Sequence, residues 1–318
     1  MPSPPSPVPI AEYTRSGMVE GVHVGHVAIV DGAGAVVRSW GDPGQVIYPR
    51  SANKPVQAAA MVGSGLDLPP RLLALAASSH SGEPFHLSAV RDILAHAGLD
   101  ETWLQTPPDW PLDPVERDAW LGAGQARTSV AMNCSGKHAA MLATCVAQGW
   151  SLHSYRDPAH PLQVAIAARL ASLAGEPIAH TGVDGCGAPV LAISLAGLAR
   201  SAARLVLAEA GSPEGQVAAA MRDHPDVVGG TRRDVTEFMR AVPGLMAKDG
   251  AAGVYVAALP DGTAIAVKVE DGSDAARRVV LAEVLIGLGA DPGALAGLRE
   301  EPVFGGGEAV GRLHSLVG

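Results

Sequence analysis

Two parts of the chain, residues 18–40 and 253–269, each contain a pair of short apolar stretches separated by turn-forming residues. The turn residues are Asp31-Gly32-Ala33-Gly34 in the first part and Pro260-Asp261-Gly262 in the second. Short apolar stretches on both sides of a Gly- and Asp-rich turn are typical of β-hairpins. The pattern therefore predicts one hairpin near each end of the chain.

Between these hairpins, apolar residues recur mostly at helical spacing. Helices are predicted over 55–63, 71–77, 86–96, 139–148, 161–174, 191–209 and 213–222, and a last one over 274–289. Residues 100–127 form a long irregular stretch, which is more often a functional loop than a linker. Strands from both ends with helices between them predict a mixed α and β fold. We expect one central, mostly antiparallel sheet formed from both chain ends, with a helical lobe across it.

Composition narrows the class of protein. Apolar residues make up 47% and charged residues 17% of the 318 residues, and the net charge is −9. With no cluster of Lys and Arg, these values argue against a nucleic-acid or anionic-membrane partner. Residues 1–12 are expected to be a flexible lead-in with no signal-peptide pattern, and 13–318 a single domain. Only three cysteines and no apolar run of membrane-spanning length predict a cytoplasmic protein with reduced thiols.

The first candidate for chemistry is Ser51, which Lys54 and Pro55 follow in the stretch Arg50-Ser51-Ala52-Asn53-Lys54-Pro55. On a helix, positions three apart share a face, so Lys54 is able to lie over the Ser51 hydroxyl. A lysine whose pKa is lowered by burial or by a nearby positive charge can act as the base that serine needs. By itself the spacing is common by chance and is more often a helix cap with a solvated lysine.

A second hydroxyl and a second lysine would strengthen this interpretation. Ser79, in the polar cluster Ser78-Ser79-His80-Ser81, and Lys268, late in the second hairpin, are the candidates. Spacing alone does not pair them.

Other positions allow two interpretations each. Cys134, Lys137 and Cys186 suit a zinc site, although a lysine ligand is unusual and the spacing alone favours two ordinary buried cysteines. Asp184 either binds an amino group or closes its own turn, and His138 either orients a nucleophile or is a hydrogen-bonded turn residue. The loop 229–233, which ends in two arginines, either binds a carboxylate or faces water.

Taken together in order, these segments resemble the Rhizobium-type asparaginase II family, whose members have a serine β-lactamase-like fold. The matching stretches run from residue 13 to about 273. They are Tyr13-Thr14-Arg15-Ser16-Gly17, Arg50 to Gln57, Ser79-His80-Ser81-Gly82-Glu83, Asn133 to His138, His160-Pro161-Leu162-Gln163, Val183 to Gly187, Pro225 to Gly230, Lys248 to Tyr255 and the strand of Lys268.

This resemblance implies hydrolysis of L-asparagine to aspartate and ammonia by two serine–lysine pairs. On this chain they are Ser51 with Lys54 and Ser79 with Lys268. A serine would attack the side-chain amide while a lysine takes its proton, giving an acyl-enzyme that water hydrolyses. The resemblance also implies a homodimer and no organic cofactor.

The same resemblance implies one zinc ion and a set of substrate contacts. Zinc would be held by Cys134, Lys137 and Cys186. The α-amino and α-carboxylate groups of the substrate would be bound by Arg50, His138 and Asp184. Gly21 and Ala252 depart from the usual family pattern, which bears on substrate affinity.

Two other classes stay open. One is a serine–lysine amidase for a different amide, such as glutamine or a peptidoglycan-type bond, which keeps Ser51 and Lys54 but needs no Asp184. The other is a non-catalytic relative that binds zinc through the thiol site.

Overall fold

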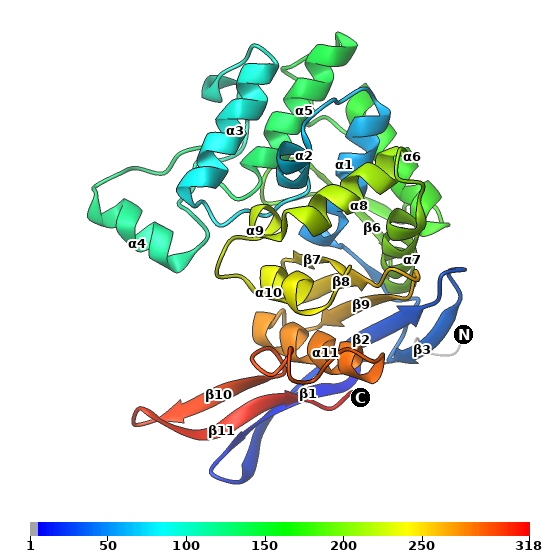
Figure 1. Ribbon diagram of the computed structural model, residues 1–318, viewed down its shortest axis with the longest axis vertical. Helices are drawn as coiled ribbons and strands as arrows, with labels where there is room; N and C mark the ends of the chain where they lie inside the picture. Colours follow the sequence, from blue (N-terminus) through cyan, green and yellow to red (C-terminus); the bar gives the residue numbers. More distant parts are fainter. Residues whose placement is uncertain (1–5) are drawn as a thin grey trace.

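The computed structural model describes residues 6–318 and combines one large antiparallel sheet with a helical lobe (Figure 1). The strands of the large sheet lie in the order β10-β11-β1-β2-β9-β8-β7, and β3 pairs with β2 beside this path. They are β1 (Val8–Arg15), β2 (Met18–Val30), β3 (Val36–Trp40), β7 (Met246–Gly250), β8 (Val254–Ala258), β9 (Ala264–Val269), β10 (Glu300–Gly305) and β11 (Glu308–Ser315). The sheet is thus formed from both chain ends, which confirms the predicted class of fold.

Helices cover both faces of this sheet. They are α1 (Lys54–Gly63), α2 (Pro70–Ala76), α3 (Pro84–His96), α4 (Pro114–Gly122), α5 (Ser135–Gln148), α6 (Pro161–Ala174), α7 (Leu195–Leu207), α8 (Pro213–Asp223), α9 (Pro225–Val228), α10 (Asp234–Ala241) and α11 (Asp274–Gly287), with the 3₁₀ turns η1 (Arg50–Asn53) and η2 (Glu101–Trp103). Figure 1 shows the helical lobe on one side of the strands and α11 on the other. Because α7 and α11 both pack on β8 and β9, every residue of β8 is buried.

Most of the predicted elements are confirmed. Both hairpins form, as β2 with β3 and β8 with β9, and the helix expected over 274–289 is α11. Many helices begin at a proline, whose fixed φ and missing N–H suit the first helical turn. Within residues 6–318 no helix is long and apolar enough to span a membrane.

The predicted helix over 191–209 is wrong at its start. Residues up to Ser194 belong to β6 (Pro189–Ser194), the middle strand of a small sheet with β4 (Val46–Ile47) and β5 (His180–Val183). Ser194 then caps α7 by accepting a hydrogen bond from the N–H of Gly197. A buried strand lacks the alternation of polar and apolar residues that marks a half-exposed strand. Where it leads directly into a helix, the sequence pattern does not separate the two.

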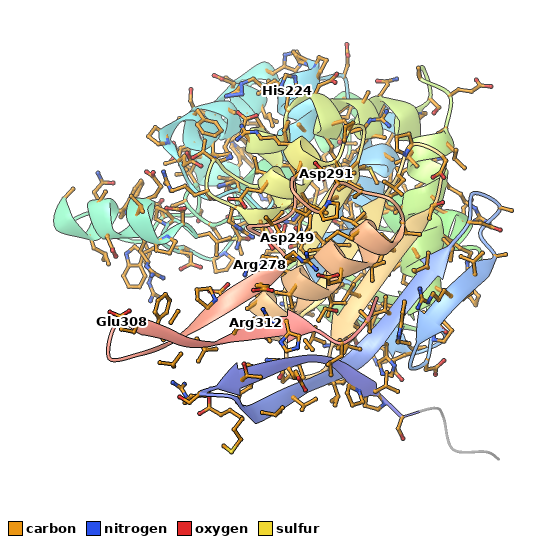
Figure 2. The ribbon with its side chains drawn as sticks, turned by 60° about the horizontal axis from the view of Figure 1, so that its bottom comes forward. His224, Asp249, Arg278, Asp291, Glu308 and Arg312 are labelled. Carbon is orange, nitrogen blue, oxygen red and sulfur yellow. The ribbon has the colours of Figure 1, made fainter. Side chains whose placement is uncertain are left out.

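The lead-in is also shorter than expected. Residues 8–12 form the first part of β1, paired with β2 and β11, while residues 1–5 lie outside the described part of the chain. The C-terminal strands were not predicted individually. Figure 2 shows their hairpin extending away from the body of the protein, with Glu308 at its tip and Arg278 of α11 at its base.

The edge strand β7 lies against η1, and this contact positions Ser51. A Cβ added at Gly250 would lie 2.6 Å from the carbonyl oxygen of Pro49 and 3.1 Å from the N–H nitrogen of Ala52. Both neighbours are backbone atoms, so neither can turn aside. Glycine at this position therefore allows the strand to approach the serine.

We predict that Gly250→Ala destabilises the protein by about 1–3 kcal/mol, because the added methyl group overlaps the backbone of η1. Urea unfolding should show this loss together with reduced activity. Gly122→Ala is the control, since a Cβ there meets nothing within 4 Å. Equal stability of the two variants would contradict the close-approach role of Gly250.

Candidate active site

Ser51 lies in η1 directly after a strained residue. Arg50 has φ of 52°, in the left-handed region that residues with a side chain seldom adopt, and Pro49 precedes it. Ser51 is partly exposed, whereas Ala52 and Asn53 behind it are buried. Backbone strain of this kind persists only where the surroundings fix it, and it is concentrated at functional sites.

Lys54 reaches a different serine from the one that spacing suggests. Its side chain is completely buried, and its Nζ donates to Ser79 Oγ at 2.9 Å and to the Ser78 carbonyl oxygen at 2.6 Å. Among the described residues no hydrogen bond joins Lys54 to Ser51. Nevertheless, Ser51 and Ser79 line the same pocket of about 140 Å³. The structure therefore brings Ser51, Lys54 and Ser79 together at one site.

The segment that carries Ser79 is fixed by buried hydrogen bonds. The Ser79 N–H donates to the Val228 carbonyl oxygen at 3.2 Å, and Ser81 Oγ donates to that of Gly229 at 2.8 Å. The buried His80 contacts Ser135 Oγ through Nε2 at 2.8 Å, and burial lowers its pKa well below the usual value. Of the neighbouring serines, only Ser79 both accepts from Lys54 and lines the pocket.

Lys268 is not at this site. Its Nζ donates to the carbonyl oxygens of Ala252, at 2.7 Å, and Val269, at 2.9 Å. In the sheet it lies opposite His26 of β2 and Val254 of β8, and it does not line the pocket. The predicted pair of Ser79 with Lys268 is therefore not formed, because Lys268 closes the turn between β7 and β8.

The second lysine beside Lys54 is Lys248, on β7. It is completely buried, and its Nζ donates to the backbone and side-chain oxygens of Asp249. Burial and the positive charge of Lys54 lower the pKa of Lys248, Asp249 opposes them, and the result is a pKa of about 8. Sequence reasoning missed this role. The available signal was a lysine directly after apolar Leu245-Met246-Ala247 and before Asp249-Gly250.

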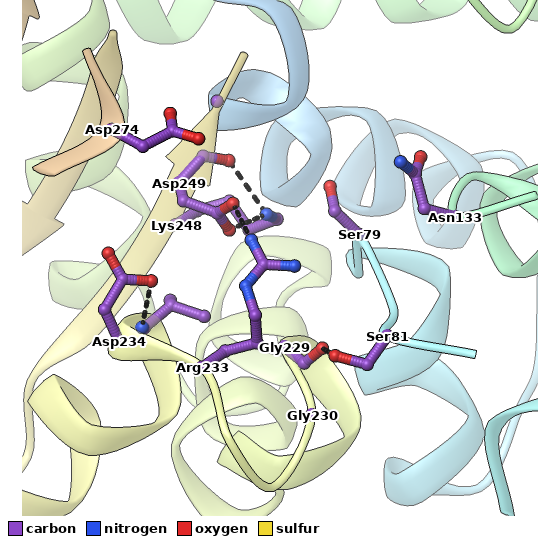
Figure 3. Close-up of polar contacts among 12 residues, drawn as sticks. Ser79, Ser81, Asn133, Gly229, Gly230, Arg233, Asp234, Lys248, Asp249 and Asp274 are labelled. Carbon is purple, nitrogen blue, oxygen red and sulfur yellow. Dashed lines mark hydrogen bonds and ion pairs between the residues drawn. The ribbon is translucent and has the colours of Figure 1, made fainter. Parts of the chain in front are cut away.

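Asp249 is the centre of the charged network drawn in Figure 3. Lys248 Nζ donates to Oδ1 of Asp249, and Arg233 Nη2 donates to Oδ2 at 2.6 Å. Arg277 Nη2 lies 3.8 Å from the same Oδ2. Burial acts to raise the pKa of Asp249, but these three cations hold it far below its usual value. Asp249 is thus a permanent anion between two arginines and a lysine.

The pocket between the serines and this network opens toward a larger cavity. Its other lining residues include Asn133, Arg233, Asp249, Ala251 and Arg277. A neighbouring cavity of about 390 Å³ shares Leu112, Arg233, Asp274 and Arg277 with it. A ligand at the serines would therefore meet charged groups mainly on the arginine side.

The predicted zinc ligands do come together. Lys137 Nζ lies 3.1 Å from Cys186 Sγ, and Cys134 and Cys186 pack in one buried cluster. Donation from the Cys134 thiol and the charge of Lys137 lower the pKa of Cys186 far below its usual value. The same hydrogen bond raises the pKa of Cys134. Two sulfurs and an amine in one buried cluster fit zinc once the metal replaces their protons.

No conventional metal site competes with this cluster. Within residues 6–318 no group of three His, Cys, Asp or Glu side chains could hold a metal ion. Lys137 would therefore have to be the third protein ligand. Burial opposes its charge, but Cys186, Cys134 and Asp184 raise its pKa well above the ordinary value.

The three residues expected to bind substrate lie near the cluster of Cys134, Lys137 and Cys186, which we call the thiol side of the site. Arg50 Nε donates to Asp184 Oδ1 at 2.7 Å, and His138 Nδ1 lies 2.7 Å from the Tyr155 hydroxyl. His138 Nε2 is buried without a partner among the described residues, and burial lowers its pKa to about 4, so the ring is neutral. None of these three residues lines the pocket shared by Ser51 and Ser79.

Two serines around one pocket, with two buried lysines next to them, are the components of a serine hydrolase that uses lysine as its base. The sequence matches the L-asparaginase II family over residues 11–315, and the chain belongs to that family. It is accordingly an amidohydrolase. No curated protein matches the chain.

Several solved structures are similar to the chain. A β-lactamase from Mycobacterium bovis is 19% identical, with a TM-score of 0.45 over 81% of this chain and 94% of that one. Mglu in its native form is 16% identical, with a TM-score of 0.44 over 83% of this chain and 63% of that one. A Bacillus glutaminase is 13% identical, with a TM-score of 0.38 over 83% and 90%.

Proposed function

We propose that the protein hydrolyses L-asparagine to L-aspartate and ammonia through a serine-bound acyl-enzyme. The observation that supports this most directly is the bond from the buried Lys54 to Ser79 in a pocket that Ser51 also lines. Membership of the L-asparaginase II family supports L-asparagine as the substrate.

In the proposed reaction Ser51 Oγ attacks the side-chain amide carbon of asparagine. The hydroxyl proton passes to the hydrogen-bonded pair of Lys54 and Ser79. A proton returns from this pair to the leaving nitrogen as ammonia departs. Water then attacks the ester carbon, gives its proton to the same base, and releases aspartate. Lys248 supplies the second basic group, and its low pKa lets it exchange protons near neutral pH.

The thiol side completes the proposal. Cys134, Lys137 and Cys186 would hold one zinc ion, which when bound would supply a fixed positive charge on the thiol side of the site. We assign the α-amino group of the substrate to Asp184, which Arg50 orients. We also propose that the protein is cytoplasmic, as its free cysteines suggest, and that it forms a homodimer.

We predict that Ser51→Ala lowers ammonia release from L-asparagine by about 10⁴-fold or more, because the attacking oxygen is lost. A coupled ammonia assay with purified variants measures this, and Ser79→Ala should also lose activity because it removes the partner of Lys54. Ser88→Ala, on the exposed side of α3, is the control. Full activity of Ser51→Ala with an inactive Ser79→Ala would make Ser79 the nucleophile.

The pH dependence tests Lys248. In the proposed reaction the neutral form of Lys248 is the second base. The share of this form increases as pH rises through the Lys248 pKa of about 8, so kcat/KM should rise over that range. Asp249→Asn removes the negative charge that raises this pKa, so the rise should shift to lower pH. A rise that stays at the same pH in Asp249→Asn would show that another group controls it.

Metal content tests the thiol site. Purified wild-type protein should contain about one zinc per chain, and Cys134→Ala should lose most of it. Cys145→Ala is the matched control, because Cys145 is buried in the apolar core at the other end of α5. Undiminished zinc in a folded Cys134→Ala variant would rule out these ligands.

A further inference from the structure

Arg233 has a free hydrogen-bonding group at the active-site pocket. It stands immediately before α10, and its side chain is only 19% exposed. Nη2 donates to Asp249 Oδ2, but Nη1 is buried and has no hydrogen-bond partner within residues 6–318. In Figure 3 this second amino group points away from Asp249, toward the side on which Ser79 lies.

An unpartnered buried guanidinium nitrogen is costly. Leaving a buried donor without a partner destabilises a protein, and it does so more strongly when the group is charged. Such groups normally find a partner in protein, water or ligand. Because Arg233 lines the same pocket as Ser51 and Ser79, a bound ligand is in a position to supply that partner.

The loop before Arg233 is held firmly to the serine segment. Thr231 donates to Glu83 through its N–H at 2.7 Å and its hydroxyl at 2.8 Å, and Gly230 adopts φ of 135°. A Cβ at Gly230 would lie 2.1 Å from Ser81 Oγ. The guanidinium is therefore fixed relative to Ser79 before any ligand binds.

The two arginines of the pocket are the groups that can hold an anion. Arg233 and Arg277 line it together with the carboxylates of Asp249 and Asp274. Arg277 is largely engaged. Its Nη1 donates to the Gly250 and Val254 carbonyl oxygens and its Nη2 lies 3.1 Å from Asp274 Oδ1, so that only Nε is buried without a partner among the described residues. Arg233 instead has a terminal amino group free beside the serines. The free Nη1 of Arg233 can donate a charge-assisted hydrogen bond to a carboxylate oxygen, which is stronger than a bond to a neutral group.

We propose that Arg233 is the residue that binds the carboxylate of the substrate, and so makes the pocket selective for amides that carry an α-carboxylate. This assignment rests on the proposed amidase function. It departs from the expectation that Arg50, His138 and Asp184 together bind the α-amino and α-carboxylate groups, since Arg50 is already bonded to Asp184.

The experiment compares two substrates on four proteins. L-Asparagine and 3-aminopropanamide differ only in the α-carboxylate, and kcat/KM for both is measured on wild type, Arg233→Gln, Arg50→Gln and Arg232→Gln. Arg232 is the matched control, since it neighbours Arg233 but pairs with Asp113 and Glu116 outside the serine pocket.

Wild type should have a higher kcat/KM for L-asparagine than for 3-aminopropanamide. In Arg233→Gln the ratio of these two kcat/KM values should fall about 10- to 100-fold. The reason for using the ratio is that damage to Asp249 or Lys248 lowers activity on both substrates alike. Arg232→Gln should keep the wild-type ratio. Retention of the ratio in Arg233→Gln, or its loss in Arg50→Gln alone, would overturn the assignment.

Two further measurements cover the remaining cases. If Arg233→Gln does not fold, Arg233→Lys keeps a cation on Asp249 but loses the planar fork, and the same loss of preference is expected. If wild type hydrolyses neither substrate, the proposed function fails, and calorimetry with succinamate, which has the carboxylate and amide without the amino group, tests Arg233 separately. Binding of succinamate at least tenfold weaker to Arg233→Lys than to wild type supports the assignment, and equal binding overturns it.

Discussion

The active site depends on the ion pairs that the buried carboxylate of Asp249 makes. It compensates Lys248, Arg233 and Arg277, which come from β7, the start of α10, and α11. Removing one partner from a buried ion pair costs about 3–5 kcal/mol, because the other charge is left uncompensated. Asp249 therefore holds three elements from the last third of the chain at one point beside η1.

The same carboxylate sets the balance of charge at the lysines. Burial and mutual repulsion lower the pKa of Lys248, and Asp249 limits that decrease to a value of about 8. Without the anion, several cations would face each other in a region closed to water. With it, a lysine changes its protonation close to neutral pH, as a general base requires.

Much of the architecture could be predicted from the sequence, because most elements carry a local signal. Turn residues marked the hairpins, and prolines marked many helix starts. The strand β6 could not be predicted, since its apolar run continues into α7 without a break in pattern. The choice between Lys248 and Lys268 failed for a related reason. Both are lysines in largely apolar strands near a Gly-rich turn, and only the order of strands places Lys248 beside η1.

The serine–lysine spacing pointed to Ser51 and Lys54, but the hydrogen bond that it suggested between them does not form. Positions 51 and 54 do lie in adjoining turns, η1 and the start of α1, but the hydrogen bond of Lys54 crosses to Ser79. The functional unit therefore exists only when α1, the 78–81 segment and β7 pack together. The close approach of Gly250 to η1 fixes one side of this unit, and the bonds of Ser79 and Ser81 fix the other. Tertiary packing, and not the helical repeat, therefore positions the proposed nucleophile and base.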